Sequence, residues 1–462
     1  MVRKQCDVAI AGSGFSGLVA ANILADRGLR VLVLDENARM GGQVLRSLPW
    51  PGGPPGPDGL RRRGARLIDG MKAKPVEVLN RTKVLDIGDH LELTAEREER
   101  QIISVAPKAL LLATGAREKF MPFKGWTLPG VISTGAAQIL MKGSGVLPAG
   151  SMLVSGTGPF LLALAAEYLK NGGRLLSILD FGGPAEKLRG VQHAAFSKLL
   201  EGARHMAALL MARTPYRPRT MVLEARGRGE LEAVVAAKVS RRGSVVPGTE
   251  RIYRTGCLAV GWGFAPNLEL PLRAGCALTH DPAAGGWVVR AGAGLETSVA
   301  GIFAAGEITG VGGALKSILE GELAACGILK KLGAGVDSGR LRLLERQRDR
   351  HLRFAKYFNR LHAVPAALFA DIPDEVTICR CEDVKMADIR RAVNGGCDTP
   401  AMLKRALRIG MGNCQGRTCA PIVYDILAAL TKRPAEDIPP LSVRGPVKAA
   451  AIRSFLEPDE PA

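Results

Sequence analysis

Short apolar runs alternate along the chain with segments in which apolar residues recur at helical spacing. Residues 6–11 predict a buried strand, followed by a glycine-rich turn and by a helix that ends at Gly28. A second strand is predicted over residues 31–34, immediately before Asp35. Strand, tight turn, helix and strand in this order are typical of the first half of a nucleotide-binding α/β domain.

The same order of elements returns in the middle of the chain. Residues 152–155 and 175–179 predict strands on either side of a helix over residues 160–169, and Gly156 begins the turn before that helix. The chain has 462 residues, and a domain takes about 150. We therefore predict an α/β fold with two doubly wound, Rossmann-like domains and a smaller third domain.

A strongly basic segment begins the last third of the chain. Between residues 340 and 362, eight Lys or Arg residues stand against two acidic residues, and Leu344 and Leu352 are among the apolar residues at roughly helical spacing. This pattern predicts a basic amphipathic helix that joins two domains. A small cysteine-bearing unit is predicted after it, from Thr377 to about Leu430.

The composition is ordinary for a folded protein, but the charge is not. Hydrophobic residues make up 47% and charged residues 23%, which excludes a wholly disordered chain, and no run of 18 apolar residues predicts a membrane span. The formal net charge is +19, yet aromatic residues reach only 5% and no nucleic-acid-binding motif is present. We therefore expect an acidic protein partner rather than a nucleic acid, and no removed signal peptide.

The first turn carries the pattern Gly12-x-Gly14-x-x-Gly17. The first glycine makes the turn, the second lets a pyrophosphate approach the backbone at a helix N-terminus, and the third packs helix against strand. Asp35 lies 18 residues after Gly17, at the strand end where an acid accepts hydrogen bonds from ribose hydroxyls. Glu36 is the alternative acid, because the sequence does not fix the strand end to one residue.

Two further strand ends support a nucleotide site. Thr114-Gly115 and Gly306-Glu307 each follow an apolar strand, where glycine lets a cofactor pass and an acid meets ribityl hydroxyls; together with the first turn they favour FAD over NAD. In the second opening Leu161 stands where the third glycine is expected, which disfavours a working NAD(P) site there.

Four of the nine cysteines form two close pairs, Cys379-x-Cys381 and Cys414-x4-Cys419. Four thiolates can hold a [2Fe–2S] cluster, and the adjacent glycines leave backbone N–H groups free to approach sulfur. A structural zinc site is the alternative, although zinc pairs are usually separated by two to four residues. The clustering favours a metal site in a reducing, cytoplasmic compartment over a disulfide framework, and Cys397 stands apart from both pairs.

Other familiar redox chemistry has no support in the sequence. No close cysteine pair follows Gly41-Gly42-Gln43, where flavin disulfide reductases carry their redox cysteines, so disulfide reduction is disfavoured. The six histidines form no pair at metal-ligand spacing, and we assign no catalytic residue.

The order of motifs resembles the A subunits of opine oxidases, the B subunit of hydrogen cyanide synthase and the α subunits of proline or hydroxyproline dehydrogenase complexes. The resemblance covers nearly the whole chain, and its cysteine unit is the most specific part. The segments that carry it are Gly12–Gly17, Asp35-Glu36, Gly41-Gly42-Gln43, LATG at 112–115, GWTLPGV at 125–131, GWGFAPN at 261–267, AGE at 305–307, CRCEDV at 379–384 and GMGNCQGRTC at 410–419.

This resemblance implies a glutathione- or thioredoxin-reductase-like body, in which the second Rossmann-like domain is inserted in the first, with a C-terminal [2Fe–2S] domain of the bacterioferritin-associated type. The implied boundaries are 1–118 with 248–335 for the first domain, 119–247 for the second, 336–373 for a basic helical linker, 374–435 for the cysteine domain and 436–462 for a tail.

The resemblance also implies a heteromeric complex. An amino-acid-oxidase-like partner subunit with its own FAD oxidises the C–N bond of an amino acid, imino acid or opine, and this chain passes the electrons to an external acceptor. A small ferredoxin-like subunit is a further implied partner, and any contact with the inner membrane is through the acceptor. FMN occurs at the subunit contact in some relatives, and ATP or NAD is the alternative to FAD at the first site.

Motifs and resemblance together assign the site residues. The metal ligands are Cys379, Cys381, Cys414 and Cys419. The cofactor-binding residues are Gly12, Gly14, Phe15, Ser16, Gly17, Asp35, Glu36, Gly42, Gln43, Thr114, Gly115, Gly306 and Glu307. Two other functions stay open: a stand-alone NAD(P)H-dependent flavin oxidoreductase, and a nucleotide-binding assembly subunit without electron flow.

Overall fold

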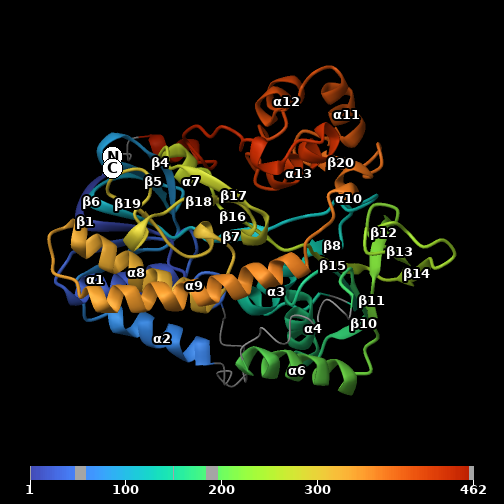
Figure 1. Cartoon of the computed structure of the whole chain (residues 1–462), viewed down its shortest axis with the longest axis horizontal. Helices are drawn as coiled ribbons and strands as arrows, with labels where there is room; N and C mark the ends of the chain where they lie inside the picture. Colours follow the sequence, from blue (N-terminus) through green and yellow to red (C-terminus); the bar gives the residue numbers. More distant parts are fainter. Residues whose placement is uncertain (1, 47–58, 149, 184–195, 457–462) are drawn as a thin grey trace, which may run out of the picture. The chain divides into compact units, whose positions relative to one another are not determined.

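The computed structural model describes residues 2–46, 59–148, 150–183 and 196–456 (Figure 1). The chain divides into two compact units. The first comprises Met1–Arg117, Pro266–Lys356 and Ser442–Ala462, and the second comprises Glu118–Ala265 and Tyr357–Leu441. The last residues of the predicted tail, 457–462, lie outside the described part of the chain.

The first unit is built on a seven-stranded sheet with the order β3-β2-β1-β6-β5-β4, in which β19 also pairs with β6. Strands β3, β2, β1, β6 and β19 run parallel, and β4 and β5 are antiparallel additions. The strands are β1 (Val2–Ala11), β2 (Val31–Leu34), β3 (Val76–Leu79), β4 (Thr82–Ile87), β5 (Leu93–Arg97), β6 (Gln101–Leu112) and β19 (Ile302–Ala304).

Apolar residues cover both faces of this sheet, as a continuous apolar run such as that of β2 requires. Leu18 and Ile328 belong to the core on the face covered by α1 and α8, and Leu110 and Leu270 belong to the core on the other face. The remaining elements of this unit are α1 (Phe15–Asp26), α2 (Gly59–Met71), α7 (Glu269–Arg273), β17 (Leu278–Asp281), β18 (Gly286–Val289), α8 (Ala314–Lys331) and most of α9 (Ser338–Leu361).

The second unit contains a five-stranded parallel sheet, β11-β10-β9-β15-β8, and a three-stranded antiparallel sheet, β12-β13-β14. Its strands are β8 (Val131–Ser133), β9 (Ser151–Gly156), β10 (Arg174–Asp180), β11 (Tyr216–Pro218), β12 (Thr220–Arg226), β13 (Ala233–Lys238), β14 (Arg251–Arg254) and β15 (Cys257–Gly261). Its helices before residue 265 are α3 (Thr134–Ser144), α4 (Phe160–Lys170) and α6 (Phe196–Met211).

The chain returns to the first unit later than the sequence predicts. The expected boundary at residue 248 would place β15 in the first domain, but β15 pairs with β9 in the register Cys257↔Met152 and completes the second parallel sheet. The unit boundaries instead fall within β7 (Ala116–Glu118) and β16 (Phe264–Pro266). The boundary shifts because β15 pairs with a strand more than 100 residues earlier in the chain, and the local sequence pattern carries no information about such pairing.

The C-terminal residues also depart from the expected division. Part of the predicted 436–462 tail belongs to the first unit: the Val447 N–H donates to the Leu85 carbonyl at 2.7 Å, and the Ser454 hydroxyl donates to Glu96 at 2.8 Å. The helix predicted over residues 340–362 is confirmed as α9, and its final residues from Tyr357 on belong to the second unit.

The cysteine-bearing segment is small and mostly helical. It shares one hydrophobic core with the second unit, in which Ile422 and Ile426 join Phe123 and Trp126. The Trp126 indole N–H donates to the Thr377 carbonyl at 2.7 Å. The elements are α10 (Ala367–Ala370), β20 (Thr377–Cys379), β21 (Val384–Lys385), α11 (Met386–Asn394), α12 (Pro400–Leu407) and α13 (Ala420–Thr431).

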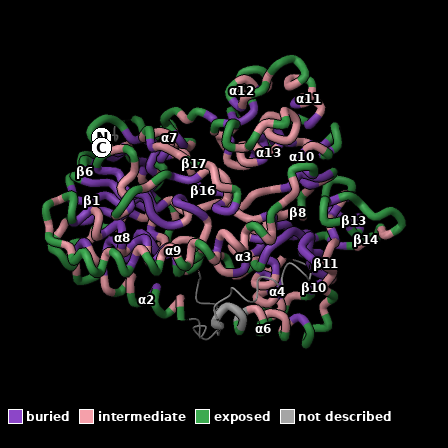
Figure 2. Tube along the Cα trace, in the orientation of Figure 1, coloured by how far each residue is buried: buried purple, intermediate pink, exposed green. Residues whose placement is uncertain are grey.

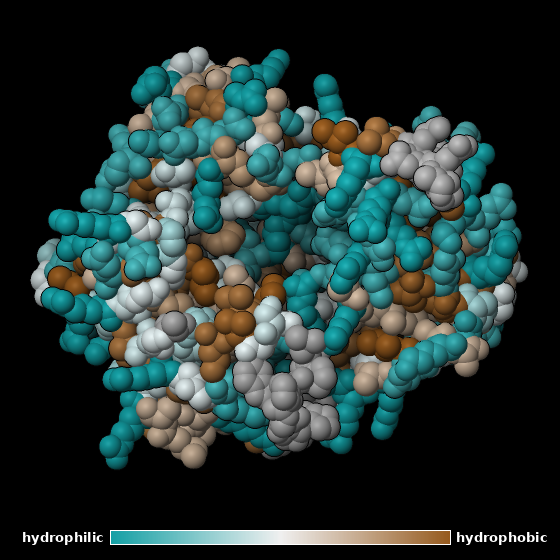
Figure 3. Space-filling view, turned by 180° about the vertical axis from the view of Figure 1, so that it is seen from behind, coloured by the Kyte–Doolittle hydropathy of each residue, from teal (hydrophilic) through white to brown (hydrophobic). Residues whose placement is uncertain are grey.

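Burial follows the strands of the two parallel sheets (Figure 2). On the face drawn in Figure 3, hydrophobic side chains form several separate groups among hydrophilic ones. Within the described residues, no helix combines the length and the apolar character that crossing a bilayer requires.

Candidate functional site

The first glycine turn is held by close backbone packing. Gly12 has a φ of 107°, and a Cβ there would lie 2.4 Å from the Ala113 carbonyl oxygen. A Cβ on Gly17 would lie 2.1 Å from the Gly12 carbonyl oxygen, whereas a Cβ on Gly14 would meet no atom within 4 Å. Packing therefore requires the first and third glycines, and the space above the second is open at the N-terminus of α1, where an anion binds best.

The two predicted ribose acids have different surroundings. The Asp35 carboxylate is 4% exposed and accepts hydrogen bonds from the Ser13 N–H at 2.7 Å, from the Ser13 hydroxyl, and from the Asn37 N–H and side-chain amide, both at 2.8 Å. Glu36 is exposed and pairs with Lys448. Within the chain the Asp35 oxygens thus brace the glycine turn, and Glu36 is the exposed acid; the assignment of a ribose acid to either residue stays a prediction.

Other predicted nucleotide residues also lie at this turn. A Cβ on Gly42 would lie 2.9 Å from the Gly14 Cα, so the segment after β2 folds against the middle glycine, although Gln43 itself is exposed. A Cβ on Gly306 would lie 2.7 Å from the Ser16 hydroxyl oxygen. Phe15 differs from the expectation, because its side chain is 5% exposed and belongs to the core, which leaves its backbone for the site.

Thr114 and Gly115 are connected to the loop that follows β16. The Asn267 side-chain amide donates to the Thr114 carbonyl at 2.7 Å, and the Asn267 N–H donates to the Gly115 carbonyl at 3.0 Å. A Cβ on Gly115 would meet no atom within 4 Å. The strand ends of β1, β6 and β19 thus bring the predicted glycines to one edge of the sheet, where a cofactor binds in an open α/β fold.

Glu307 lies between β19 and the N-terminus of α8. Its carboxylate accepts hydrogen bonds from the N–H groups of Gly312 at 3.3 Å and Gly313 at 2.9 Å, and from the Ser317 hydroxyl at 3.3 Å. Burial raises the pKa of the Glu307 carboxyl, and the nearby Lys316 ammonium partly opposes this shift.

Sequence reasoning missed a buried ion pair beneath this edge. Lys316 and Glu320 are both fully buried and pair at 2.8 Å. The Lys316 ammonium also donates to the carbonyls of Gly306 at 2.6 Å and Gly310 at 2.9 Å, while Arg348 on α9 pairs with the second Glu320 oxygen at 3.0 Å. The Lys-x3-Glu spacing was the available signal, but it is also typical of exposed helix faces.

The four predicted cysteine ligands meet as two pairs. The Cys379 and Cys419 side chains are hydrogen-bonded to each other, as are those of Cys381 and Cys414. The backbone N–H of Gly410 bonds to the Cys379 sulfur, and that of Gly416 bonds to the Cys414 sulfur. Segments more than 30 residues apart in the chain thus place four sulfurs and several N–H donors together.

The environment of these sulfurs differs from that of the core cysteines. The hydrogen bond from Cys419, with backbone N–H groups, lowers the pKa of Cys379 to about 5. Burial instead raises the pKa of Cys6 to about 12 and that of Cys257 to about 11. Thiolate, the form that binds iron, is favoured at Cys379 and, through backbone N–H groups that outweigh burial, at Cys414, whereas the hydrogen bond to Cys379 and burial raise the pKa of Cys419.

The two pairs of thiols fit the four-cysteine ligand set of a binuclear cluster. Two pairs of thiols suit two irons, and a Cβ on Gly412 would lie 2.2 Å from the Cys381 Cβ, so a glycine is required beside the pair. Cys397 instead packs against the hydrophobic core.

Comparison with known protein families agrees with this geometry. The model of the family described as "Pyridine nucleotide-disulphide oxidoreductase" matches residues 6–325. The chain belongs to this family. Residues 377–429 of this family member match a second model, described as "BFD-like [2Fe-2S] binding domain". Together the two matches confirm the predicted cofactor types, FAD and a [2Fe–2S] cluster.

Individual relatives align with nearly the full length of the chain. An opine oxidase A-type subunit of Rhizobium meliloti is 31% identical over 98% of this chain and 99% of its own. Hydrogen cyanide synthase subunit HcnB of Pseudomonas aeruginosa is 31% identical over 96% and 97%. The structure of L-proline dehydrogenase from P. horikoshii has a TM-score of 0.72 at 19% identity, covering 99% of this chain and 80% of that one. The predicted resemblance and fold class are confirmed.

The second opening has a core leucine at the third position and a histidine beside its turn, while a Cβ on Gly158, as on Gly14, would meet no atom within 4 Å. Leu161 is 1% exposed and lies in the core of the second unit. His362, which follows α9, lies with its Nδ1 3.3 Å from the Thr157 hydroxyl, and a Cβ on Gly182 would lie 3.5 Å from the same nitrogen. The imidazole therefore occupies the space next to the Gly156–Gly158 turn.

Proposed function

We propose that this chain is the electron-transferring subunit of a heteromeric flavin and iron–sulfur dehydrogenase that acts on the C–N bond of an amino acid, imino acid or opine. The substrate is oxidised in an amino-acid-oxidase-like partner subunit, and this chain receives the electrons and delivers them to an external acceptor. Full-length similarity to subunits of multi-subunit enzymes supports the heteromeric state.

One observation carries the proposal: a single chain combines a nucleotide site at a glycine turn with four thiols that lie in two pairs. When bound, FAD and a [2Fe–2S] cluster supply two-electron and one-electron redox chemistry, respectively. The motifs of the chain assign residues to these two sites and assign none as a general base for amine oxidation. This division of labour is why the oxidation step is assigned to a partner.

The residues of the glycine turn and the two acids after β2 receive distinct roles in this proposal. Gly14, with the N–H groups at the start of α1, binds the pyrophosphate, Gly12 and Gly17 allow the close packing of the turn, and Gly42 borders the open space. Glu36 accepts the ribose hydroxyls. Asp35 acts through Ser13 as a positioning residue.

The remaining assignments concern the strand ends and the cluster. Gly115 leaves room for the cofactor at the end of β6, Gly306 lets the end of β19 pack closely against Ser16, and Glu307 faces the ribityl chain of the cofactor. The metal ligands are Cys379, Cys381, Cys414 and Cys419, with N–H donors from Gly410 and Gly416 tuning the potential. We propose a cytoplasmic location, where such a cluster is kept in a reducing environment.

The test is co-expression of this chain with an adjacent amino-acid-oxidase-like gene product. The purified complex should contain two irons and two sulfides per chain, and a substrate amine should bleach the visible bands of the cluster anaerobically. Cys414→Ser should remove these bands, because one iron loses a thiolate, while Cys397→Ser should leave them intact.

Two results would contradict the proposal. A colourless, zinc-containing chain would support the assembly role instead. Rapid bleaching of the flavin of the isolated chain by NADPH, without any partner, would support the stand-alone oxidoreductase.

A further inference from the structure

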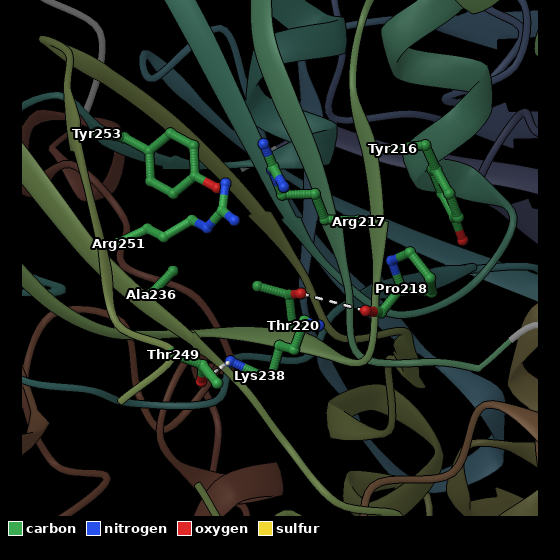
Figure 4. A pocket seen from close by; sticks show the side chains of 9 residues that line it. All are labelled: Tyr216, Arg217, Pro218, Thr220, Ala236, Lys238, Thr249, Arg251 and Tyr253. Carbon is green, nitrogen blue, oxygen red and sulfur yellow. Dashed lines mark hydrogen bonds between the residues drawn. The ribbon is translucent and has the colours of Figure 1, made fainter. Parts of the chain in front are cut away.

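The second unit contains a pocket that none of the assigned sites uses. It encloses about 220 Å³ between β11 and one face of the three-stranded sheet β12-β13-β14 (Figure 4). Across this sheet Thr220 lies opposite Lys238, and Ala236 lies opposite Arg251. Alternation along the strands puts these side chains and Tyr253 on the same face.

The lining is strongly cationic. Arg217 comes from β11, and Lys238 and Arg251 come from the sheet, so positive groups approach from two sides. Figure 4 shows the side chains of Arg217 and Arg251 extending toward the same space, with the Tyr253 hydroxyl turned toward it. No carboxylate is among the residues that line the pocket.

Nearby acids are already engaged elsewhere. Glu224 pairs with Lys124 at 3.0 Å and with Arg226 at 2.6 Å, and Asp180 accepts hydrogen bonds from the Tyr216 hydroxyl and the Gly182 N–H. Among the described residues, no carboxylate forms an ion pair with Arg217, Lys238 or Arg251, the three cations of the pocket.

Two buried polar atoms at this site lack a partner. The Arg217 Nε and the Tyr253 hydroxyl oxygen are both inaccessible to solvent, and within the described residues neither has a hydrogen-bond partner. A buried donor without a partner is unfavourable and is uncommon in folded proteins. Both donors would gain a partner if the two side chains turned these groups toward an acceptor bound in the pocket.

We propose that this pocket binds the phosphate group of a small phosphorylated metabolite. A phosphate monoester carries nearly two negative charges and three acceptor oxygens, which matches three cations and the Tyr253 hydroxyl better than a planar carboxylate does. The volume suits a small ester and not a dinucleotide, which separates this site from the nucleotide openings. The proposal does not depend on the electron-transfer function.

The test is a titration of the holoprotein with inorganic phosphate and with glycerol 2-phosphate at constant ionic strength, followed by calorimetry and ³¹P NMR. We expect saturable binding that is weakened at least about tenfold, equivalent to about 1.4 kcal/mol, by Arg217→Gln and by Tyr253→Phe. Arg251→Gln, at the exposed rim, should weaken it without any effect on folding. Succinate at the same concentration should not compete.

The matched control is Arg254→Gln. Arg254 lies on the same strand β14 but on its other face, so this variant removes the same charge without touching the pocket. Equal weakening by Arg254→Gln and Arg251→Gln would overturn the proposal, because it would mean that net charge alone attracts phosphate. Succinate binding as tightly as phosphate, or no saturable binding, would also overturn it.

Discussion

The two nucleotide-type openings of the chain begin alike and end differently. Both place a Gly-x-Gly turn after a buried parallel strand, at Gly12 and at Gly156. In the first unit the third glycine, Gly17, brings the helix within contact of the turn, and the space above Gly14 is open. In the second unit Leu161 belongs to the core, and His362 lies beside the turn.

The comparison distinguishes residues that the fold requires from residues that nucleotide binding requires. The turn after the first strand is required by the topology, since a Cβ on Gly156 would lie 1.8 Å from the Gly261 carbonyl oxygen, just as one on Gly12 would collide with Ala113. Such glycines are needed whether or not a nucleotide binds. The space above the middle glycine is open in both turns, so the residue at the third position and the histidine beside the second turn are what distinguish the two openings.

The largest expected effect comes from making the first opening resemble the second. In Gly17→Leu, the new Cβ would overlap the Gly12 carbonyl, so α1 cannot pack against β1 and the nucleotide should be lost completely. The measurement is the nucleotide content of the purified protein together with its unfolding midpoint in urea.

The reverse variant, Leu161→Gly, completes this test. It should cost about 2–5 kcal/mol of stability, because it leaves a cavity in the second core, without creating a nicotinamide site. Retention of full nucleotide content by Gly17→Leu would mean that the packing argument fails.

A smaller effect is expected when only the open space is filled. Gly14 has φ −66°, which alanine tolerates, and no atom lies within 4 Å of its Cβ position. Gly14→Ala should therefore leave the unfolding midpoint unchanged while reducing nucleotide affinity by about tenfold, or about 1.4 kcal/mol. Reconstitution of the stripped protein with FAD measures this. An unchanged affinity would place the nucleotide elsewhere.

A substitution of His362 tests whether its imidazole keeps NADH out of the second opening. The wild-type chain should show no rapid flavin bleaching by NADH. In His362→Ala, the space beside Thr157 opens, so we expect NADH binding to become measurable by fluorescence quenching, at a stability cost of about 1 kcal/mol for the lost hydrogen bond. His351→Ala, earlier on α9, is the control. Tight NADH binding by the wild type would show that the imidazole does not close the site.

The smallest effect concerns a buried carboxyl of the second unit. Glu118 accepts hydrogen bonds from the Thr134 hydroxyl and, at 2.8 Å, from the Gly135 N–H at the start of α3. Burial raises the pKa of this carboxyl above its unfolded value of about 4.3. Its folded state therefore binds the proton more tightly, and the stabilisation is complete below about pH 4.3 and is lost as the pH rises through the raised pKa.

Glu118→Gln removes this titration. Relative to the wild type, the variant should gain stability, by less than about 1 kcal/mol, as the pH rises from about 4 to about 8. Urea unfolding at a series of pH values measures the difference. Parallel curves for the two proteins would contradict the assigned pKa direction.

Much of the fold was predictable because its signals are local. The strand at residues 31–34, the α9 helix and the glycine turns each follow from a few neighbouring residues. The boundary at residue 248 was wrong because β15 joins the second sheet only through pairing with β9, which no local pattern encodes. The Lys316–Glu320 pair was missed because its spacing is equally common on exposed helices.

The sequence by itself determined the kinds of chemistry present: a glycine turn for phosphate, acids at strand ends, and four cysteines in two pairs. Residue type and spacing suffice to predict these features, because each consists of residues that are close together in the sequence. The tertiary structure alone decided that Asp35 turns inward while Glu36 stays accessible, that His362 reaches the Thr157 turn, and that Arg217 and Arg251 line one pocket. These outcomes depend on contacts between residues distant in the chain, and burial and hydrogen bonding at such contacts are set only when the whole unit packs.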